Sequence, residues 1–322
     1  MTLGRAFIPK VALAFALIAP LSAGAAEWKP TETTQMIVAS GAGTAFDVMS
    51  RGMSKIWEKH FGVRMVVQNL AAAGGALGVD RVATSKPDGN TLGFMSRSAF
   101  LSQMLKPDFP WKIDDLPIVL GADTPPYVIT TSAKSAFKTW DDVRKSKTRV
   151  KIGIAGQIST DVAVIRDLID RKVEVTTASF GGTNQIVTAL QAGDVDVWTV
   201  VASQTAMDPI KAGHVRPLFV FANQRYSLLP DTPTHIELGM PAEWTNVSAV
   251  RLWFAPIGTP VEIQAGVAKR IVSLLEDPEI KDWNYSNGFV EKILSGAEAK
   301  ATQVGMHKII ADNIELFNKF GG

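Results

Sequence analysis

The 322-residue chain contains no cysteine. This absence excludes disulfides, iron–sulfur clusters, thiolate zinc sites, a catalytic thiol and a lipid anchor on cysteine. An excess of charge of one sign is also missing, because 33 Lys and Arg residues stand against 31 Asp and Glu, for a net charge of +2. The chain therefore lacks the basic excess typical of nucleic-acid binders, and we expect no nucleic-acid partner. With 46% hydrophobic and 20% charged residues, the composition predicts a well-cored globular protein rather than a disordered one.

Catalytic motifs are missing as well. The four histidines are scattered and form no His-x-x-x-His or Glu-paired motif, and no serine has glycine at both flanking second positions, as a nucleophile elbow requires. Asp194 and Asp196 lie two apart at the entrance of a predicted strand, where turn and cap roles explain them better than an acid–base pair. We therefore expect no enzyme activity, no cofactor and no metal site. An exported α/β hydrolase is the alternative from another class.

The N-terminus carries the pattern of a targeting segment. Arg5 and Lys10 precede the uncharged stretch 11–26, which contains the small-residue sequence Ala23-Gly24-Ala25. This pattern predicts a secretory signal peptide over residues 1–25; an uncleaved anchor is the alternative, although a transmembrane helix needs about 20 apolar residues. Cleavage removes two positive charges and no negative one, so the mature net charge becomes +2 − 2 = 0. Together with the missing lipidation cysteine, this predicts an exported protein that is free in the periplasm.

Strands and helices alternate along the remainder of the chain. In the first part, apolar runs predict strands at 35–39, 65–67 and 91–95, with helices over 47–60 and through 79–82. This order implies a parallel sheet covered by helices. A second unit starts near Pro125, with strands predicted at 127–131, 151–155, 173–177, 195–201 and 216–221. An extended crossing at 250–256 then leads to helices predicted over 261–275 and 298–317.

The predicted fold class is therefore α/β with two lobes. We expect residues 26–124 plus 250–322 to form lobe 1 and residues 125–249 to form lobe 2. Two chain crossings between the lobes predict hinges near 122–125 and 247–252. A boundary between two such units is a preferred place for a ligand cleft.

The first candidate binding loop is Ser40–Asp47, with the sequence Ser-Gly-Ala-Gly-Thr-Ala-Phe-Asp. Its glycines permit close approach of a ligand, and the helix that follows offers unpaired N–H groups that suit an anion. The dinucleotide fingerprint G-x-G-x-x-G fails, because Phe46 occupies the position of its last glycine. A tight turn with Asp47 as an ordinary helix cap is the alternative explanation.

Further candidate loops follow other predicted strands. Ser96-Arg97-Ser98 is expected to form a loop whose guanidinium binds a carboxylate bidentately, with a solvated surface arginine as the alternative. In the second unit, the polar segments 156–161 and 181–184 precede helices, and routine N-capping explains each of them individually. Several such loops after strand ends are nevertheless typical of the ligand crevice of an open α/β sheet.

Several motifs occur in the order known from one protein family. The segment Val66–Asn69 with Ala73–Gly75 is similar to V-V-x-N followed by G-A-G-G, and further matches lie at Lys86–Leu92, Leu190–Asp196, Ile210–Leu218, Leu229–Thr234 and Trp253–Pro260. The mature chain thus resembles the extracytoplasmic solute receptors of tripartite tricarboxylate transporters, the Bug or TctC family.

The resemblance implies a type II periplasmic binding-protein fold, with two Rossmann-like lobes that close on a solute, and a membrane permease as the partner. The family's ligands are mostly carboxylates, and one carboxylate is typically held by backbone amides of the first loop and of the facing loop. Departures from the family's pattern, among them Phe46, Arg97, Asp161 and Gly181, favour a dicarboxylate or an aromatic carboxylate over a citrate-like ligand. We expect a monomer. Presentation of the ligand to a membrane sensor kinase, rather than to a permease, is the alternative.

The candidate ligand-binding residues belong to these loops and to the strand predicted at 195–201. They are Ala42, Gly43, Thr44, Phe46, Asp47, Ser96, Arg97, Ser98, Gln157, Ser159, Thr160, Asp161, Thr183, Asn184, Trp198 and Thr199.

Overall fold

The computed structural model describes residues 28–104, 106, 108–112, 114–155, 161–180, 183–286 and 289–320. The predicted signal peptide, residues 1–25, lies outside the described residues. The same holds for three candidate binding residues: Gln157, Ser159 and Thr160.

The first sheet has six strands in the order β11-β4-β10-β3-β1-β2. Their bounds are Thr34–Val38 (β1), Met65–Asn69 (β2), Thr91–Ser96 (β3), Ile118–Asp123 (β4), Val250–Phe254 (β10) and Lys292–Ser295 (β11). Strand β1 pairs in parallel with β2 and β3, which confirms the parallel core predicted from the sequence. Strand β10 lies between β3 and β4 and runs antiparallel to both, so the complete sheet is mixed.

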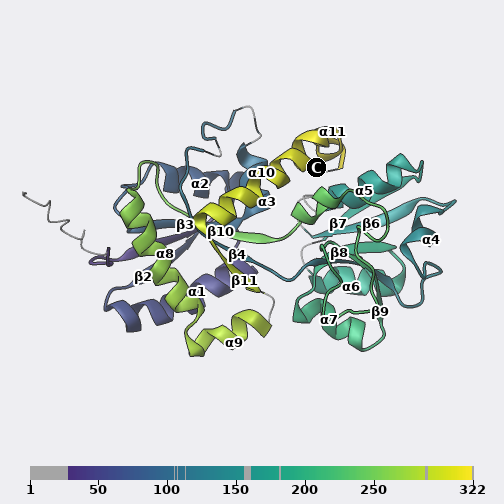
Figure 1. The fold of residues 1–322 in the computed structure, drawn as a ribbon, viewed down its shortest axis with the longest axis horizontal. Helices are drawn as coiled ribbons and strands as arrows, with labels where there is room; N and C mark the ends of the chain where they lie inside the picture. The colour runs from purple at the N-terminus through teal and green to yellow at the C-terminus, as the bar shows by residue number, and fades with distance from the viewer. Residues whose placement is uncertain are drawn as a thin grey trace, which may run out of the picture.

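Helices cover both faces of the first sheet (Figure 1). Apolar side chains of α1 (Ala45–Phe61), α8 (Val261–Leu275) and α9 (Pro278–Ser286) pack on one face, against Phe94 and Trp253 among others. The opposite face is covered by α2 (Ala76–Ala83), α3 (Arg97–Met104) and α10 (Gly296–Asp312). A short 3-10 helix, Ala72–Gly75, precedes α2.

The second sheet has five strands in the order β7-β6-β8-β5-β9. Their bounds are Tyr127–Ser132 (β5), Val150–Ala155 (β6), Val175–Phe180 (β7), Val197–Val201 (β8) and Val215–Val220 (β9). The helices of this unit are Trp140–Arg144 (α4), Asp161–Asp170 (α5), Thr183–Ala192 (α6) and Gln204–Lys211 (α7), with the 3-10 helix Ala242–Asn246 (η2) after β9. Thr139 is the N-cap of α4 in a complete capping box with Asp142.

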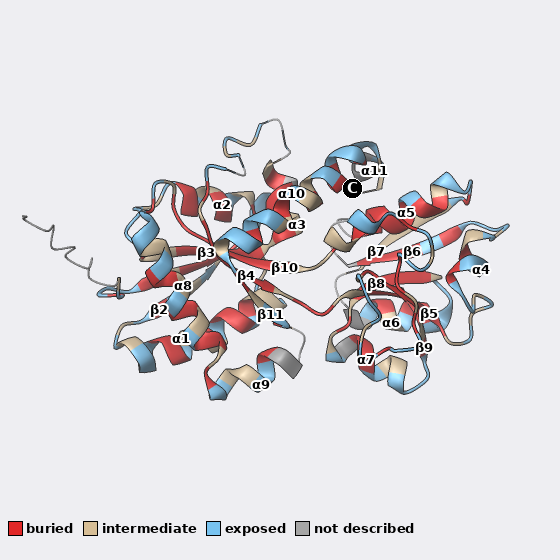
Figure 2. Cartoon of the chain, viewed as in Figure 1, coloured by how far each residue is buried: buried red, intermediate tan, exposed pale blue. Residues whose placement is uncertain are grey.

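The central strands of both sheets, such as β10 and β8, are buried and appear red in Figure 2, whereas the edge strands β2 and β7 are mostly half-buried or exposed. One close contact in the first sheet depends on a glycine. A Cβ atom on Gly93 in β3 would lie 2.1 Å from the ring of Phe254 in the neighbouring strand β10. The missing side chain therefore lets this aromatic ring lie flat across β3.

Two chain segments connect the sheets, and they lie side by side (Figure 1). The first runs from β4 to β5, and the second runs from η2 to β10. Thr124 in the first segment donates from its backbone N (3.1 Å) and its Oγ1 (2.9 Å) to the carbonyl oxygen of Ala249 in the second. These are the positions at which the sequence predicts the hinges, and the hydrogen bonds tie the two crossings together.

The C-terminal helices reach from the first sheet to the second. The sequence predicts one helix over 298–317, whereas the chain forms α10, an interruption at Asn313, and α11 (Ile314–Phe320). Helix α11 lies beside α5 (Figure 1), and Ile309 and Phe320 pack with the core of the second sheet. The predicted division into lobe 1 and lobe 2 assigns these helices to lobe 1 and stays a prediction.

Candidate functional site

The loop that follows β1 presents open backbone amides at the start of α1. Thr44 is the N-cap residue, but its side chain makes no capping hydrogen bond. Its Oγ1 instead donates to the carbonyl of Gly41 at 2.8 Å and lies 2.7 Å from the Oγ of Ser40. In the described part of the chain, no group accepts a hydrogen bond from the first-turn amides of Ala45, Phe46 or Asp47. Unpaired amides at a helix N-terminus suit an anion.

Asp47 holds the candidate loop in place. Its Oδ2 accepts a hydrogen bond from the backbone N–H of Gly43 at 2.9 Å, and its Oδ1 pairs with Arg51 Nε at 2.9 Å. The bond from Arg51, followed by that from Gly43, lowers the pKa of the Asp47 carboxyl below its ordinary value. Arg51 also donates to Asn69 Oδ1 at 3.1 Å. The carboxylate is thus ionised and balanced by a cation, so it adds little repulsion against an anionic ligand at the neighbouring amides.

The expected loop at Ser96-Arg97-Ser98 does not exist, because β3 ends at Ser96 and α3 begins at Arg97. The Ser96 hydroxyl accepts from the backbone N–H of Ala99 at 3.2 Å and lies 3.4 Å from the Oγ of Ser98. The strand therefore passes directly into the helix, with Ser96 capping it in the usual manner of a serine.

Arg97 is a buried structural link and has an exposed fraction of 1%, so the surface-arginine alternative is wrong. Its Nη2 donates to the carbonyls of Asn246 (2.6 Å) and Ser248, and its Nη1 donates to the carbonyl of Thr302 at 3.2 Å. Burial lowers the pKa of Arg97 to about 10, and Asp123 opposes this shift. The guanidinium joins the start of α3 to the second crossing and to α10. Ligand contact by Arg97 stays a prediction and would require one of these bonds to be replaced.

A second buried arginine, Arg251 in β10, is not among the binding residues predicted from the sequence. In the antiparallel register it lies opposite Ser96, and both side chains belong to the sheet face covered by α1. The guanidinium carbon lies 5.4 Å from the ring centroids of both Phe46 and Phe289. A signal was available in the sequence, because Arg251 is the one charged residue in the run Val250–Pro256.

Arg251 has no hydrogen-bond or ion-pair partner among the residues that the structure describes. Its exposed fraction is 8%, and neither a hydrogen bond nor an ion pair involves it there. Burial lowers its pKa to about 10, and the nearby Tyr127 at the start of β5 opposes this shift. The side chain thus places an unpaired cation beside the first turn of α1, close to the residue with which the second sheet begins.

Phe46 connects the candidate loop to the aromatic core. Its ring meets Phe94 edge-on at 5.1 Å between centroids, and Phe94 stacks on Trp253 at 4.3 Å. The structure therefore brings Phe46 and Ser96 together around Arg251. These two candidate residues come from segments about 50 positions apart in the chain.

In the second unit, Asp161 and Thr199 lie close together. Asp161 is the first residue of α5, and its burial raises the pKa of the carboxyl to about 7, against the opposing effect of Thr199. Trp198 points to the other face of β8 and packs with Ile186 beneath α6, with an exposed fraction of 1%. Thr183 and Asn184 are the first two residues of α6. Ligand contact by all five of these residues stays a prediction.

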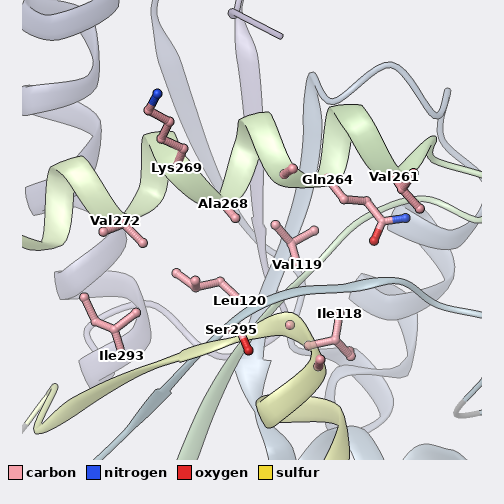
Figure 3. A pocket seen from close by; sticks show the side chains of 13 residues that line it. Ile118, Val119, Leu120, Val261, Gln264, Ala268, Lys269, Val272, Ile293 and Ser295 are labelled. Atoms are coloured by element: carbon pink, nitrogen blue, oxygen red, sulfur yellow. The ribbon is translucent and has the colours of Figure 1, made fainter. Parts of the chain in front are cut away.

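A separate hollow lies on the first sheet, away from these residues. It has a volume of about 530 Å³ and is lined by β4, α8 and the start of α10. Figure 3 shows Val119 and Ala268 facing each other across it, whereas Lys269 points away. None of the candidate binding residues lines this hollow.

Comparisons with known proteins identify one matching family profile and several related sequences. The sequence profile of the tripartite tricarboxylate transporter family receptors matches residues 48–315. A protein of Agrobacterium vitis, described as a UPF0065 protein in the TAR-I ttuE-ttuC' intergenic region, is 28% identical over 276 residues, which are 82% of this chain and 78% of the relative. Protein BugT of Bordetella pertussis is also 28% identical, over 82% of each chain.

Solved structures share the fold. A TctC solute-binding protein from Polaromonas superposes with a TM-score of 0.72 at 20% identity, covering 89% of this chain and 99% of that one. MatC from Rhodopseudomonas palustris, with bound malate, gives 0.66 at 23% identity over 90% and 99% of the two chains. An R. palustris protein with adipate gives 0.72 at 19% identity over 90% and 98%.

The two-lobe α/β periplasmic binding-protein fold predicted from the sequence is thus confirmed. In the part of the chain that the structure describes, no helix has the length and apolar character needed to cross a membrane. The family profile covers more than four-fifths of the sequence. The chain belongs to the receptors of the tripartite tricarboxylate transporter family.

Proposed function

We propose that this receptor captures a carboxylate-containing small molecule, with a dicarboxylate or an aromatic carboxylate favoured, and delivers it to a tripartite tricarboxylate-type membrane permease. It works from the periplasm after removal of its signal peptide. Capture proceeds by closure of the two lobes around the solute, with the bound state favoured because the ligand contacts both lobes only when they are closed.

The observation that carries this proposal is the open N-terminus of α1. Within the described residues, the amides of Ala45, Phe46 and Asp47 have no acceptor, and the Asp47 charge is already balanced by Arg51. A carboxylate oxygen is a strong acceptor for such amides. The relatives support the same chemistry, since MatC holds malate and another neighbour holds adipate.

A thermal-shift screen of the mature protein, residues 26–322, tests ligand capture. Malate, adipate, other linear diacids, benzoate and nicotinate are compared with sugars and divalent cations. A ligand at 100 times its Kd stabilises the folded state by about 2.7 kcal/mol, so a specific carboxylate is expected to raise Tm by several degrees. If sugars or cations raise Tm and no carboxylate does, the proposed ligand class is wrong.

The transport role is tested in cells. Deletion of the gene is expected to abolish uptake of the radiolabelled ligand found in the screen, and the ligand is expected to be recovered unchanged from the purified receptor. Unaltered uptake in the deletion strain would contradict delivery to a permease. Chemical conversion of the bound acid would contradict a receptor without catalytic activity.

A further inference from the structure

The guanidinium of Arg251 is a buried cation that takes no part in the carboxylate site proposed at the amides of α1. The residues around it come from four segments: Ser96 opposite it on β3, Phe46 on α1, Phe289 before β11 and Tyr127 at the start of β5. None of these side chains is a carboxylate. Asp123, a buried acid at the end of β4, has Arg97, Lys292 and Glu291 as charged neighbours.

Arg251 differs from Arg97 in whether its N–H groups have acceptors. Arg97 gives both terminal nitrogens to backbone carbonyls, whereas Arg251 donates to no group in the described part of the chain. Burial of an unpaired cation is strongly unfavourable. Contacts with two aromatic rings recover part of this cost. The hydrogen-bonding capacity of the guanidinium is still unused.

We propose that Arg251 binds a second carboxylate of the ligand, whose first carboxylate lies at the amides that open α1. The inference rests on the proposed function and narrows it to diacids. Phe46, on the first turn of α1, links the two positions. Its ring centroid lies 5.4 Å from the guanidinium carbon of Arg251, and its backbone N–H is one of the open amides. A planar guanidinium held over aromatic rings keeps its edge available for bidentate contact with a carboxylate.

The chain offers a matched control in Arg270 of α8. This arginine also has an exposed fraction of 8%, belongs to the same unit and lies over an aromatic ring, that of Phe61, at 5.9 Å. Phe46 and Phe61 stand at opposite ends of α1, about 22 Å apart at 1.5 Å per residue. Loss of Arg270 therefore repeats the loss of a buried cation without touching the proposed site.

The experiment measures Kd by titration calorimetry for pairs of acids that differ by one carboxylate: adipate with hexanoate, succinate with butanoate, and terephthalate with benzoate. The proteins are the wild type, Arg251→Met, Arg251→Lys and Arg270→Met. In the wild type, at least one diacid is expected to bind about 10- to 100-fold more tightly than its monoacid, as a charged hydrogen bond of this kind would give. Arg251→Met is expected to abolish this preference and to leave the Kd of the monoacid within about threefold. Arg251→Lys is expected to retain part of it, and Arg270→Met all of it.

The outcomes separate the two proposals. If no carboxylate binds to the wild type, the proposed function and this inference both fail. If carboxylates bind but the wild type does not prefer diacids, or if Arg251→Met keeps the preference, the proposed function stands and Arg251 is a structural residue. A lowered Tm in Arg251→Met with an unchanged ratio of the two Kd values would likewise make Arg251 a structural residue.

Discussion

Replacement of Asp161 by asparagine should change how the stability of this receptor depends on pH. Asp161 begins α5 with an exposed fraction of 4%, and its Oδ1 has no hydrogen-bond partner in the described part of the chain. Burial raises the pKa of this carboxyl from 3.8 to about 7, while Thr199 acts in the opposite direction. The folded protein therefore keeps a proton on Asp161 under conditions in which the unfolded chain has released it.

The sign and size of the effect follow from this difference. Between pH 4 and pH 7 the folded state binds more protons than the unfolded state, so the free energy of unfolding falls as the pH rises. Below pH 4 both states are protonated and no penalty exists. Above pH 7 the penalty is complete, and at about 1.4 kcal/mol per pH unit it amounts to about 4 kcal/mol. Asparagine has nearly the same shape and does not titrate, so Asp161→Asn should be free of this penalty.

Urea unfolding of the wild type and of Asp161→Asn, from pH 4.5 to pH 8.5, measures the penalty. The stability of the variant relative to the wild type is expected to grow by several kcal/mol over this range and to level off above pH 7.5. Asp170→Asn is the control, because Asp170 lies at the other end of α5, is exposed and pairs with Arg166. If the difference between wild type and Asp161→Asn is constant with pH, Asp161 is not a buried neutral acid.

Four further substitutions test other parts of the structure. Arg97→Met leaves three backbone carbonyls without their donor and is expected to lower the free energy of unfolding by about 3 kcal/mol in urea; a loss below 1 kcal/mol would contradict its role as a link. Asp47→Ala frees the loop before α1 and is expected to weaken carboxylate binding about tenfold, equivalent to about 1.4 kcal/mol, in calorimetry; an unchanged Kd would refute the importance of a fixed loop. Gly93→Ala places a methyl group in the ring of Phe254 and is expected to lower the free energy of unfolding by about 3 kcal/mol. Gly52→Ala, on α1 with no atom within 4 Å of the added Cβ, is expected to raise the free energy of unfolding by about 0.5–1 kcal/mol. Equal unfolding midpoints for the two variants would refute the packing argument.

Local patterns were sufficient to predict most elements of the fold. Helix α1 shows apolar residues at helical spacing, and the structure buries Met49, Met53 and Trp57 from that pattern. Helix α8 begins and ends at the predicted residues, Val261 and Leu275. In both cases the information lies within the segment itself, since the same side chains that set the periodicity also form the buried face.

Elements whose existence depends on distant partners were missed. Strands β4 and β11 were not predicted, although they pair with each other along residues 120–123 and 292–295. Their segments carry no clear alternation, and β4 becomes a strand because β10 and β11, more than 120 positions later, lie on either side of it. Strand pairing of this range cannot be read from a window of neighbouring residues.

In the candidate site too, the local sequence does not reveal the contacts with distant residues that decide the roles of the two arginines. Arg97, between two serines after a strand, has the local appearance of a ligand-binding residue, and Arg251, within an apolar run, has that of a strand residue with no special role. The structure gives Arg97 acceptors 149 to 205 positions away in the chain and gives Arg251 none within its described part. Whether a buried cation is available to a solute is thus decided by the backbone carbonyls that happen to reach it. A search for binding residues in this family should therefore ask which buried charges are unsatisfied, and only then which of them follow a strand.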